Sequence, residues 1–89
     1  MKYAFRFTTH AQRQLRSMGR QDALHILTGI TPLGSAPWRE DLDVKKLAGH
    51  PGLLCVRVGN FRLVYEVQDD ILVILVLHVG NRRDVHRDL

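Results

Sequence analysis

The sequence predicts an α+β fold in which a helical hairpin packs on one face of a small, mainly antiparallel four-stranded sheet, in the order β-α-α-β-β-β. Three observations lead to this prediction. Apolar residues alternate near the N-terminus, two segments of helical period follow, and the second half contains three apolar runs separated by short turn signals. The chain has 89 residues, enough for one core, so residues 1–89 are predicted to form a single domain.

The composition is that of a globular protein, with 45% hydrophobic and 25% charged residues. The longest apolar run, residues 71–77, is far shorter than the roughly 20 residues of a membrane helix. The N-terminus does not show the charged segment followed by an apolar segment that is typical of a signal peptide. The single cysteine, Cys55, cannot form an internal disulfide or a cysteine metal site. We therefore expect a cytoplasmic protein with no metal or other cofactor and no membrane partner.

The formal net charge is +4, and ten of the 13 basic residues are arginine. Guanidinium groups bind phosphate through paired donors and stack on bases, so this bias favours a nucleic-acid partner. An acidic protein partner would satisfy the same charge. Composition alone does not choose between these two classes of partner.

The first half of the chain predicts one strand and two helices. Apolar side chains alternate over residues 3–7, as in a strand with one buried face. Thr8 and Thr9 offer N-caps for a helix that ends near Gly19. A second helix is expected over residues 20–30, where leucine and isoleucine recur at helical spacing.

The second half predicts a three-stranded antiparallel meander. Proline, glycine and charged residues over residues 31–51 indicate a loop, with a helical turn near residues 43–47. The strands are expected at residues 53–58, 61–67 and 71–79. The turns are expected at Gly59-Asn60 and at Asp69-Asp70.

The first of these turns would bring two arginines together. A two-residue loop pairs Val58 with Phe61, so Arg57 directly faces Arg62, on the face opposite the apolar side chains. Two positive groups about 6 Å apart repel by about 1–3 kcal/mol. Either both side chains splay into solvent, with Glu66 neutralising part of the charge, or an anion binds between them. A phosphodiester is the natural candidate for that anion.

The last strand extends this pattern and adds an apolar surface. If Asp69-Asp70 forms a tight turn, Arg62 faces Leu77, and Arg82 and Arg83 follow just beyond the same edge of the sheet. The same register puts His78 beside Phe61 on the helix-facing side, as a core or rim histidine. The strand is apolar on both faces although the helices cover only one. An apolar patch on the arginine side, which a second protein would bury, is expected from Val64, Val73 and Leu75.

The segment from Asp43 to Arg87 resembles the RelE branch of the RelE/ParE toxin superfamily. The shared elements are Lys-Leu-x-Gly-x-Pro at residues 46–51, Gly-Asn-Phe-Arg-Leu-Val-Tyr at 59–65 and Val-Gly-x-Arg-Arg at 79–83. The preceding strand and helices fit the same fold, so the resemblance covers nearly the full chain. It implies the toxin of a type II toxin–antitoxin system, an mRNA interferase that cleaves messages in the ribosomal A site. In the reaction that the resemblance implies, the 2'-hydroxyl of a message nucleotide attacks the neighbouring phosphate.

The resemblance also implies which residues act. The positions that match the catalytic residues are Arg57, Arg62, Arg82 and His86. His86 is expected to protonate the leaving 5'-oxygen, because imidazole titrates near neutrality, while the arginines stabilise the phosphorane. The residues expected to bind RNA are Arg83, Lys45, Lys46, His50, Arg13 and Arg16.

Two positions depart from the family pattern. The founding member of the branch has a lysine where this chain has Cys55 and a tyrosine where it has His86. Cys55 is expected to fill space and removes one cation. The base that accepts the 2'-hydroxyl proton stays open, and His50 is one candidate because it lies on the loop before the strand.

The resemblance implies several partners and leaves two alternatives. The expected partners are the ribosome, mRNA and a cognate acidic antitoxin, through which the complex would bind operator DNA. A ParE-like gyrase poison would need no acid–base residue. A non-catalytic member would bind only its antitoxin. The same fold carries all three functions, so they are separated by activity and not by the fold.

Overall fold

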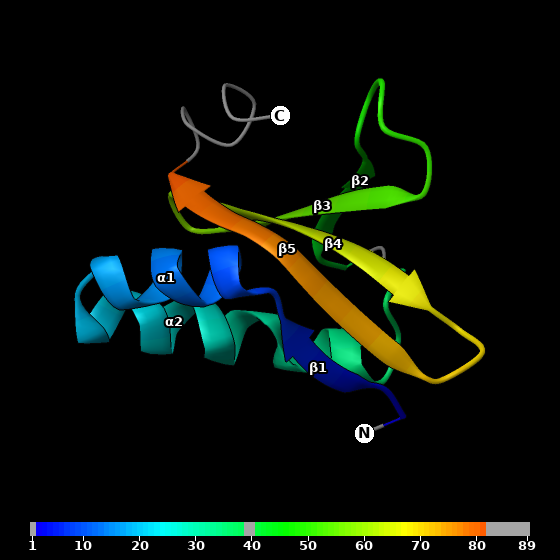
Figure 1. The fold of residues 1–89 in the computed structure, drawn as a ribbon, viewed down its shortest axis with the longest axis horizontal. Helices are drawn as coiled ribbons and strands as arrows, with labels where there is room; N and C mark the ends of the chain where they lie inside the picture. Colours follow the sequence, from blue (N-terminus) through cyan, green and yellow to red (C-terminus); the bar gives the residue numbers. More distant parts are fainter. Residues whose placement is uncertain (1, 39–40, 82–89) are drawn as a thin grey trace.

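The computed structural model describes residues 2–38 and 41–81, which form two helices and a short 3-10 helix against a five-stranded sheet. The elements are β1 (Ala4–Phe7), α1 (Thr9–Ser17), α2 (Arg20–Ile30), η1 (Thr31–Gly34), β2 (Asp43–Lys46), β3 (Leu53–Val58), β4 (Phe61–Gln68) and β5 (Val73–Asn81). The strand order is β1-β5-β4-β3-β2, and only β1 and β5 run parallel. Both helices lie on one side of the sheet (Figure 1). The predicted α+β class and helical hairpin are confirmed, but the sheet has five strands and not the predicted four.

The helices begin where their capping residues allow. The hydroxyl of Thr8 accepts a hydrogen bond of 3.1 Å from the backbone N–H of Ala11, which confirms the predicted N-cap of α1. Helix α2 spans Arg20–Ile30, the predicted range. Its apolar side carries the fully buried Ile26 and packs on the sheet.

The main core lies between the helices and one face of the sheet. The strand residues that contribute to it alternate, as predicted, and include Leu54, Val56, Val58, Leu63 and Tyr65. They meet Ala11 and Ile26 of the two helices. Burial of this set supplies the main stabilisation of the fold, because each fully buried aliphatic or aromatic side chain contributes about 1.5–3 kcal/mol.

The predicted helical turn near residues 43–47 is wrong, because Asp43–Lys46 forms the edge strand β2 and pairs antiparallel with β3. Val44 is half-buried against the core, whereas Asp43 and Lys45 are exposed. This alternation over four residues is too short to stand out in a charged segment. Charged side chains are also typical of edge strands, where they discourage pairing with other chains.

The β4–β5 connection also differs from its prediction. Four residues, 69–72, separate the paired Gln68 and Val73, where a two-residue turn was predicted. Leu72 has a φ of 54°, and its carbonyl accepts a hydrogen bond of 2.9 Å from the N–H of Ala4. This hydrogen bond links the β4–β5 connection to β1, a contact that the local sequence does not predict.

A register irregularity between Val64 and Tyr65 adds one more residue on the β5 side. As a result Arg62 faces Gly80 and not the predicted Leu77. His78 pairs with Val64 instead of Phe61, but it is buried on the helix-facing side, as predicted. Its ring contacts α1, where His10 Nε2 lies 3.2 Å from His78 Nδ1. Gln14 of α1 also contacts the ring through its amide nitrogen, 3.1 Å from Nδ1.

The predicted apolar patch on the arginine side is wrong in two of its three members. Val64 and Val73 are buried, and only Leu75 is partly exposed. Leu47 and Cys55 pack on Val64 in a second, smaller cluster. The segment that follows β2 therefore covers this part of the sheet, which explains why missing β2 also led to the wrong patch.

Neither helix in the described part of the chain has the length and apolar character that crossing a bilayer requires.

Gly29 marks the closest approach of α2 to the sheet, and its replacement by alanine tests that packing. A Cβ atom at Gly29 would lie 2.6 Å from Cγ1 of the buried Val58. We expect Gly29→Ala to lower the free energy of unfolding by about 1 kcal/mol or more, because overpacking outweighs the gain in helix propensity. Urea unfolding followed by circular dichroism measures the change.

Gly19→Ala is the matched control, because a Cβ at Gly19 meets no heavy atom within 4 Å. Gly19 is the N-cap of α2, so this control should show only the cost of an alanine cap, about 0.5–1 kcal/mol. Adding Val58→Ala should make the Gly29→Ala substitution less damaging than in the wild-type background. Equal effects of Gly29→Ala in the wild-type and Val58→Ala backgrounds would show that the close approach is not tightly packed.

Candidate functional site

A row of four residues crosses the open face of the sheet from edge strand β2 to β5. Asp43 pairs with Arg57, Arg57 pairs with Arg62, and Arg62 pairs with Gly80. The Arg57–Arg62 pairing is the one that the hairpin predicted. The row lies on the face that the helices leave uncovered, the upper side of the sheet in Figure 1. It brings one carboxylate and two guanidinium groups to a common strip of surface.

The turn between β3 and β4 fixes this row. Gly59, the first of its two loop residues, has a φ of 59°, a conformation that glycine adopts at little cost. A side chain there would also come close to α2, because a Cβ atom would lie 3.1 Å from Nε2 of His25. Glycine at this position therefore serves both the turn and the helix packing, and the turn sets the register of the arginines.

A hollow of about 170 Å³ opens beside the row. Its lining residues are Asp43, Lys45, Lys46, Leu47, Ala48, Cys55, Arg57 and Arg62. Four of the lining residues are basic and one is acidic, so the hollow keeps an excess of positive charge that favours a small anionic group.

The acidic residue stands beside one of the arginines. Asp43 Oδ2 lies 3.7 Å from Arg57 Nε, and both side chains are a little under half exposed. The distance is that of an ion pair and too long for a hydrogen bond. Such exposed pairs contribute about 0–1 kcal/mol to stability. Asp43 thus supplies one negative charge beside the arginine pair from within the chain.

Cys55 forms the floor of the hollow. It is 7% exposed and packs with Leu47 and Val64. Burial raises the pKa of its thiol, and the nearby Arg62 guanidinium offsets only part of that effect. The thiol is therefore protonated near neutrality, which agrees with a space-filling role and argues against a nucleophile or base at this position.

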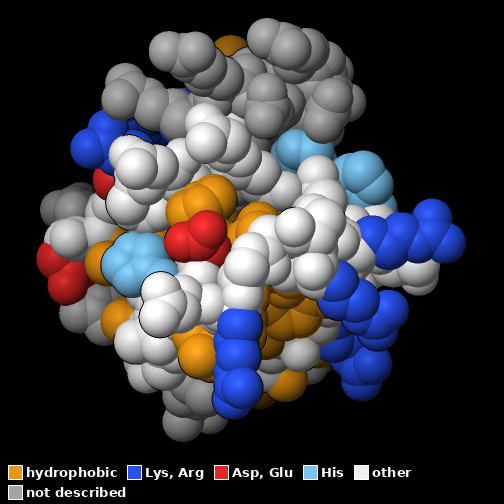
Figure 2. Space-filling model, turned by 90° about the vertical axis from the view of Figure 1, so that its left-hand side faces the viewer, with side chains coloured by type: hydrophobic (Ala, Val, Ile, Leu, Met, Phe, Trp, Pro, Cys, Tyr) orange, Lys and Arg blue, Asp and Glu red, His pale blue; other side chains and the backbone are white. Residues whose placement is uncertain are grey.

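The other residues singled out in the sequence fall in three places. Lys45 lies opposite Cys55, on the same face as the arginines, and Lys46 also lines the hollow. Arg13 and Arg16 are exposed on α1, on the helix side of the sheet. Figure 2 shows the end of the molecule where α1 ends and α2 begins, with basic side chains gathered beside α1. These two arginines are therefore remote from the row.

Three predicted site residues, Arg82, Arg83 and His86, lie outside the described residues. His50 is described and half-buried, but it lines a different hollow from the arginines. The position of His50 in the β2–β3 loop therefore does not support its predicted role as a base above the arginine pair. Asp43 was not singled out in the sequence, because its place in the row depends on the unpredicted strand β2.

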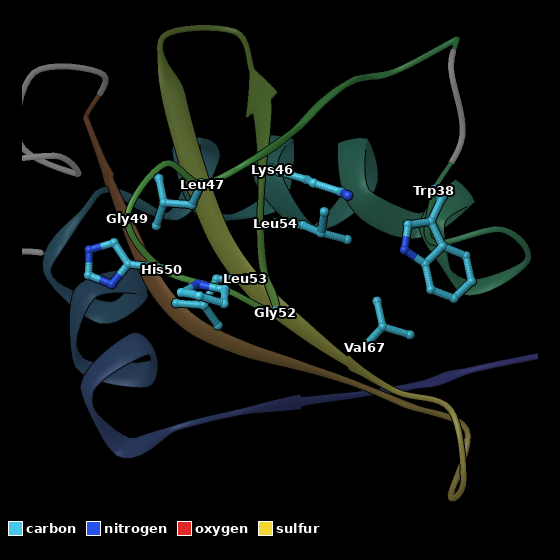
Figure 3. A pocket seen from close by; sticks show the side chains of 10 residues that line it. Trp38, Lys46, Leu47, Gly49, His50, Gly52, Leu53, Leu54 and Val67 are labelled. Carbon is cyan, nitrogen blue, oxygen red and sulfur yellow. The ribbon is translucent and has the colours of Figure 1, made fainter.

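The larger hollow, about 650 Å³, opens between the β2–β3 loop and Trp38 (Figure 3). Its lining residues are Trp38, Lys46, Leu47, Gly49, His50, Pro51, Gly52, Leu53, Leu54 and Val67. The indole of Trp38 stands at one side of the hollow and is 53% exposed. The hydroxyl of Tyr65 donates a hydrogen bond of 2.7 Å to the carbonyl of Pro37, which holds the segment before Trp38 against the sheet. An exposed tryptophan beside an apolar hollow is typical of a surface that binds a partner.

Comparison with known proteins places this geometry in a family. Residues 5–86 match the sequence family described as "ParE toxin of type II toxin-antitoxin system, parDE". Toxin RelG of Mycobacterium tuberculosis is 30% identical over 88 residues, which cover 98% of this chain and 99% of that protein.

Two solved structures show the same fold. The toxin–antitoxin complex RelBE2 from Mycobacterium tuberculosis contains a chain with a TM-score of 0.80 and 27% identity, covering 92% of this chain and 100% of its own. The intact Escherichia coli RelBE toxin–antitoxin complex gives a TM-score of 0.74 and 27% identity, with 89% and 95% covered. The family match over most of the chain and the agreement with complete toxin chains lead to one conclusion: this protein belongs to the RelE/ParE superfamily of type II toxin–antitoxin toxins.

Proposed function

We propose that this toxin is a ribosome-dependent mRNA interferase, an endoribonuclease that cleaves messages in the ribosomal A site. The observation that carries the proposal is the Arg57–Arg62 pair in a positively charged hollow on the open face of the sheet. Two arginines held side by side are costly for folding alone, since their charges repel. They match a phosphodiester, which accepts hydrogen bonds from several guanidinium donors at once.

The chemistry that fits this site is the attack of a 2'-hydroxyl on the adjacent phosphate. Negative charge grows on the phosphoryl oxygens as the pentacoordinate phosphorane forms, and preorganised cations lower the energy of that state. Arg57 and Arg62 are suited to this role because their backbones are fixed by neighbouring strands. We assign Arg82 to the same role and His86 to the protonation of the leaving 5'-oxygen, in line with their positions in the family motif.

The proposed partners follow from the relatives and from the charge of the chain. RelE toxins have been solved with antitoxins in complexes from several organisms. With a net charge of +4, this chain would attract an acidic antitoxin, and the hollow beside Trp38 would bury an apolar segment of it. The complex would bind operator DNA through the antitoxin. Ribosomes and messages place the site of action in the cytoplasm.

One observation favours an alternative function. The matching family is described by the name ParE, and the superfamily includes gyrase poisons. A gyrase poison would arrest growth with intact messages and an induced DNA-damage response. Mapping message 5'-ends after a short induction of this chain alone therefore separates the two functions.

The arginine pair is tested by Arg62→Ala. Removing a cation that stabilises the phosphorane should lower the rate of message cleavage by about 10²–10³-fold. Growth arrest on induction should weaken in parallel. Primer extension on ribosome-bound messages in a purified translation system measures the rate.

Arg20→Ala is the matched control, because Arg20 is exposed at the start of α2 on the helix side of the sheet. It removes the same charge without touching the hollow, so cleavage should stay near the wild-type rate. Unchanged thermal stability of Arg62→Ala would show that the loss is not one of folding. Full cleavage by Arg62→Ala would remove the basis of the catalytic assignment.

Trp38 reports on the partner surface, because it is the only tryptophan in the chain and half of its side chain faces solvent. Binding of the cognate antitoxin in the neighbouring hollow should bury the indole and shift its fluorescence emission to shorter wavelength. A titration with an antitoxin that lacks tryptophan measures the shift. If the complex forms and the emission stays unchanged, the antitoxin covers a different surface.

A further inference from the structure

Among the described residues of the basic hollow, Asp43 differs from all the others in its proton chemistry. The guanidinium groups of Arg57 and Arg62 and the ammonium groups of Lys45 and Lys46 offer hydrogen-bond donors and no acceptor. Burial raises the pKa of Cys55, which keeps its thiol protonated. Asp43 is the carboxylate in this lining, so it is the group there that can take a proton.

The carboxylate is also accessible and held in place. Its distance of 3.7 Å from Arg57 Nε is too long for a hydrogen bond, so this ion pair does not consume its acceptor sites. The side chain is 43% exposed. Asp43 is the first residue of β2, directly opposite Arg57, and the neighbouring Val44 packs on the core. The backbone of Asp43 is therefore fixed relative to the arginine pair.

The order of the row places the carboxylate at one end of the arginine pair. Asp43 stands at one end, Gly80 at the other, and the two arginines lie between them. Three strand spacings of about 4.8 Å separate the ends, roughly 14 Å in all. Gly80, at the β5 end, carries no side chain. A phosphate bound by the arginines would therefore have a proton acceptor on its β2 side.

We propose that Asp43 is the general base that takes the proton from the attacking 2'-hydroxyl, an inference that rests on the proposed RNA cleavage. The 2'-oxygen forms a bond to phosphorus as its proton moves to the Asp43 carboxylate, and the bond from phosphorus to the 5'-oxygen breaks. The leaving 5'-oxygen takes a proton from the general acid, the role assigned above to His86. The products are a 2',3'-cyclic phosphate and a 5'-hydroxyl, and exchange with water restores the carboxylate. The step needs no metal, oxidant or reductant.

Neutralising Asp43 separates this role from an electrostatic one. Asp43→Asn keeps the size of the side chain and makes the hollow more positive, so a purely electrostatic role predicts RNA binding and cleavage that are equal to wild type or stronger. A general base predicts a loss of about 10²–10⁴-fold in the single-turnover rate on ribosome-bound message, with RNA binding retained. Asp43→Glu should recover part of the rate, since it restores a carboxylate.

The pH dependence gives a second readout. In Asp43→Asn, solvent hydroxide must take the proton, so the residual rate should rise more steeply with pH than the wild-type rate, approaching about tenfold per unit. Asp70→Asn is the matched control, because Asp70 is exposed in the β4–β5 turn, outside the hollow, and its replacement makes the same charge change. It should cleave like wild type.

The outcomes distinguish this inference from the proposed function. If wild-type protein cleaves no message, both are overturned. Cleavage by wild type and by Asp43→Asn at similar rates overturns only the role of Asp43. A slow Asp43→Asn variant with the wild-type pH profile, or no recovery in Asp43→Glu, would assign Asp43 to positioning Arg57 and also overturn the role as a base.

Discussion

The cross-strand pairing of Arg57 with Arg62 is the constraint on which the site depends. It follows from a turn of two residues, Gly59 and Asn60, because a hairpin of that length allows one register. A shift by one residue would exchange the two faces of a strand and send the arginines into the core. The apolar face under the helices and the positive face above them are therefore two results of one pairing.

The neighbouring strands extend this pair into a row whose two ends differ chemically. Strand β2 adds Asp43 at one end, and β5 adds Gly80 at the other. The chain thus places a carboxylate beside cations, and basic residues outnumber acidic ones among the described residues that line the hollow. A hollow with both a proton acceptor and excess positive charge can bind a phosphodiester and also activate a hydroxyl next to it.

The sequence predicted the elements whose signals are local and missed those set by tertiary contacts. The two helices, β3 and the β3–β4 register follow from periodicity, capping and a glycine turn, and all were confirmed. Strand β2 was missed because it has four residues and three of them are charged, so its sequence shows little of the apolar alternation that predicts a strand. The β4–β5 register was wrong because the connection has four residues and β5 carries an extra residue at the irregularity between Val64 and Tyr65. Asp43 could not be recognised as a site residue without β2, and Arg82 and His86 rest on the family motif.

The central claim is that this strip of side chains drives attack by a 2'-hydroxyl, and the ends of the RNA products test it most directly. Messages from ribosomes exposed to the purified toxin would be ligated or labelled by reactions specific for each type of end. The account predicts a 2',3'-cyclic phosphate on the upstream fragment and a 5'-hydroxyl on the downstream one. Fragments with 5'-phosphate ends would require attack by water at the other side of the phosphate and would contradict it.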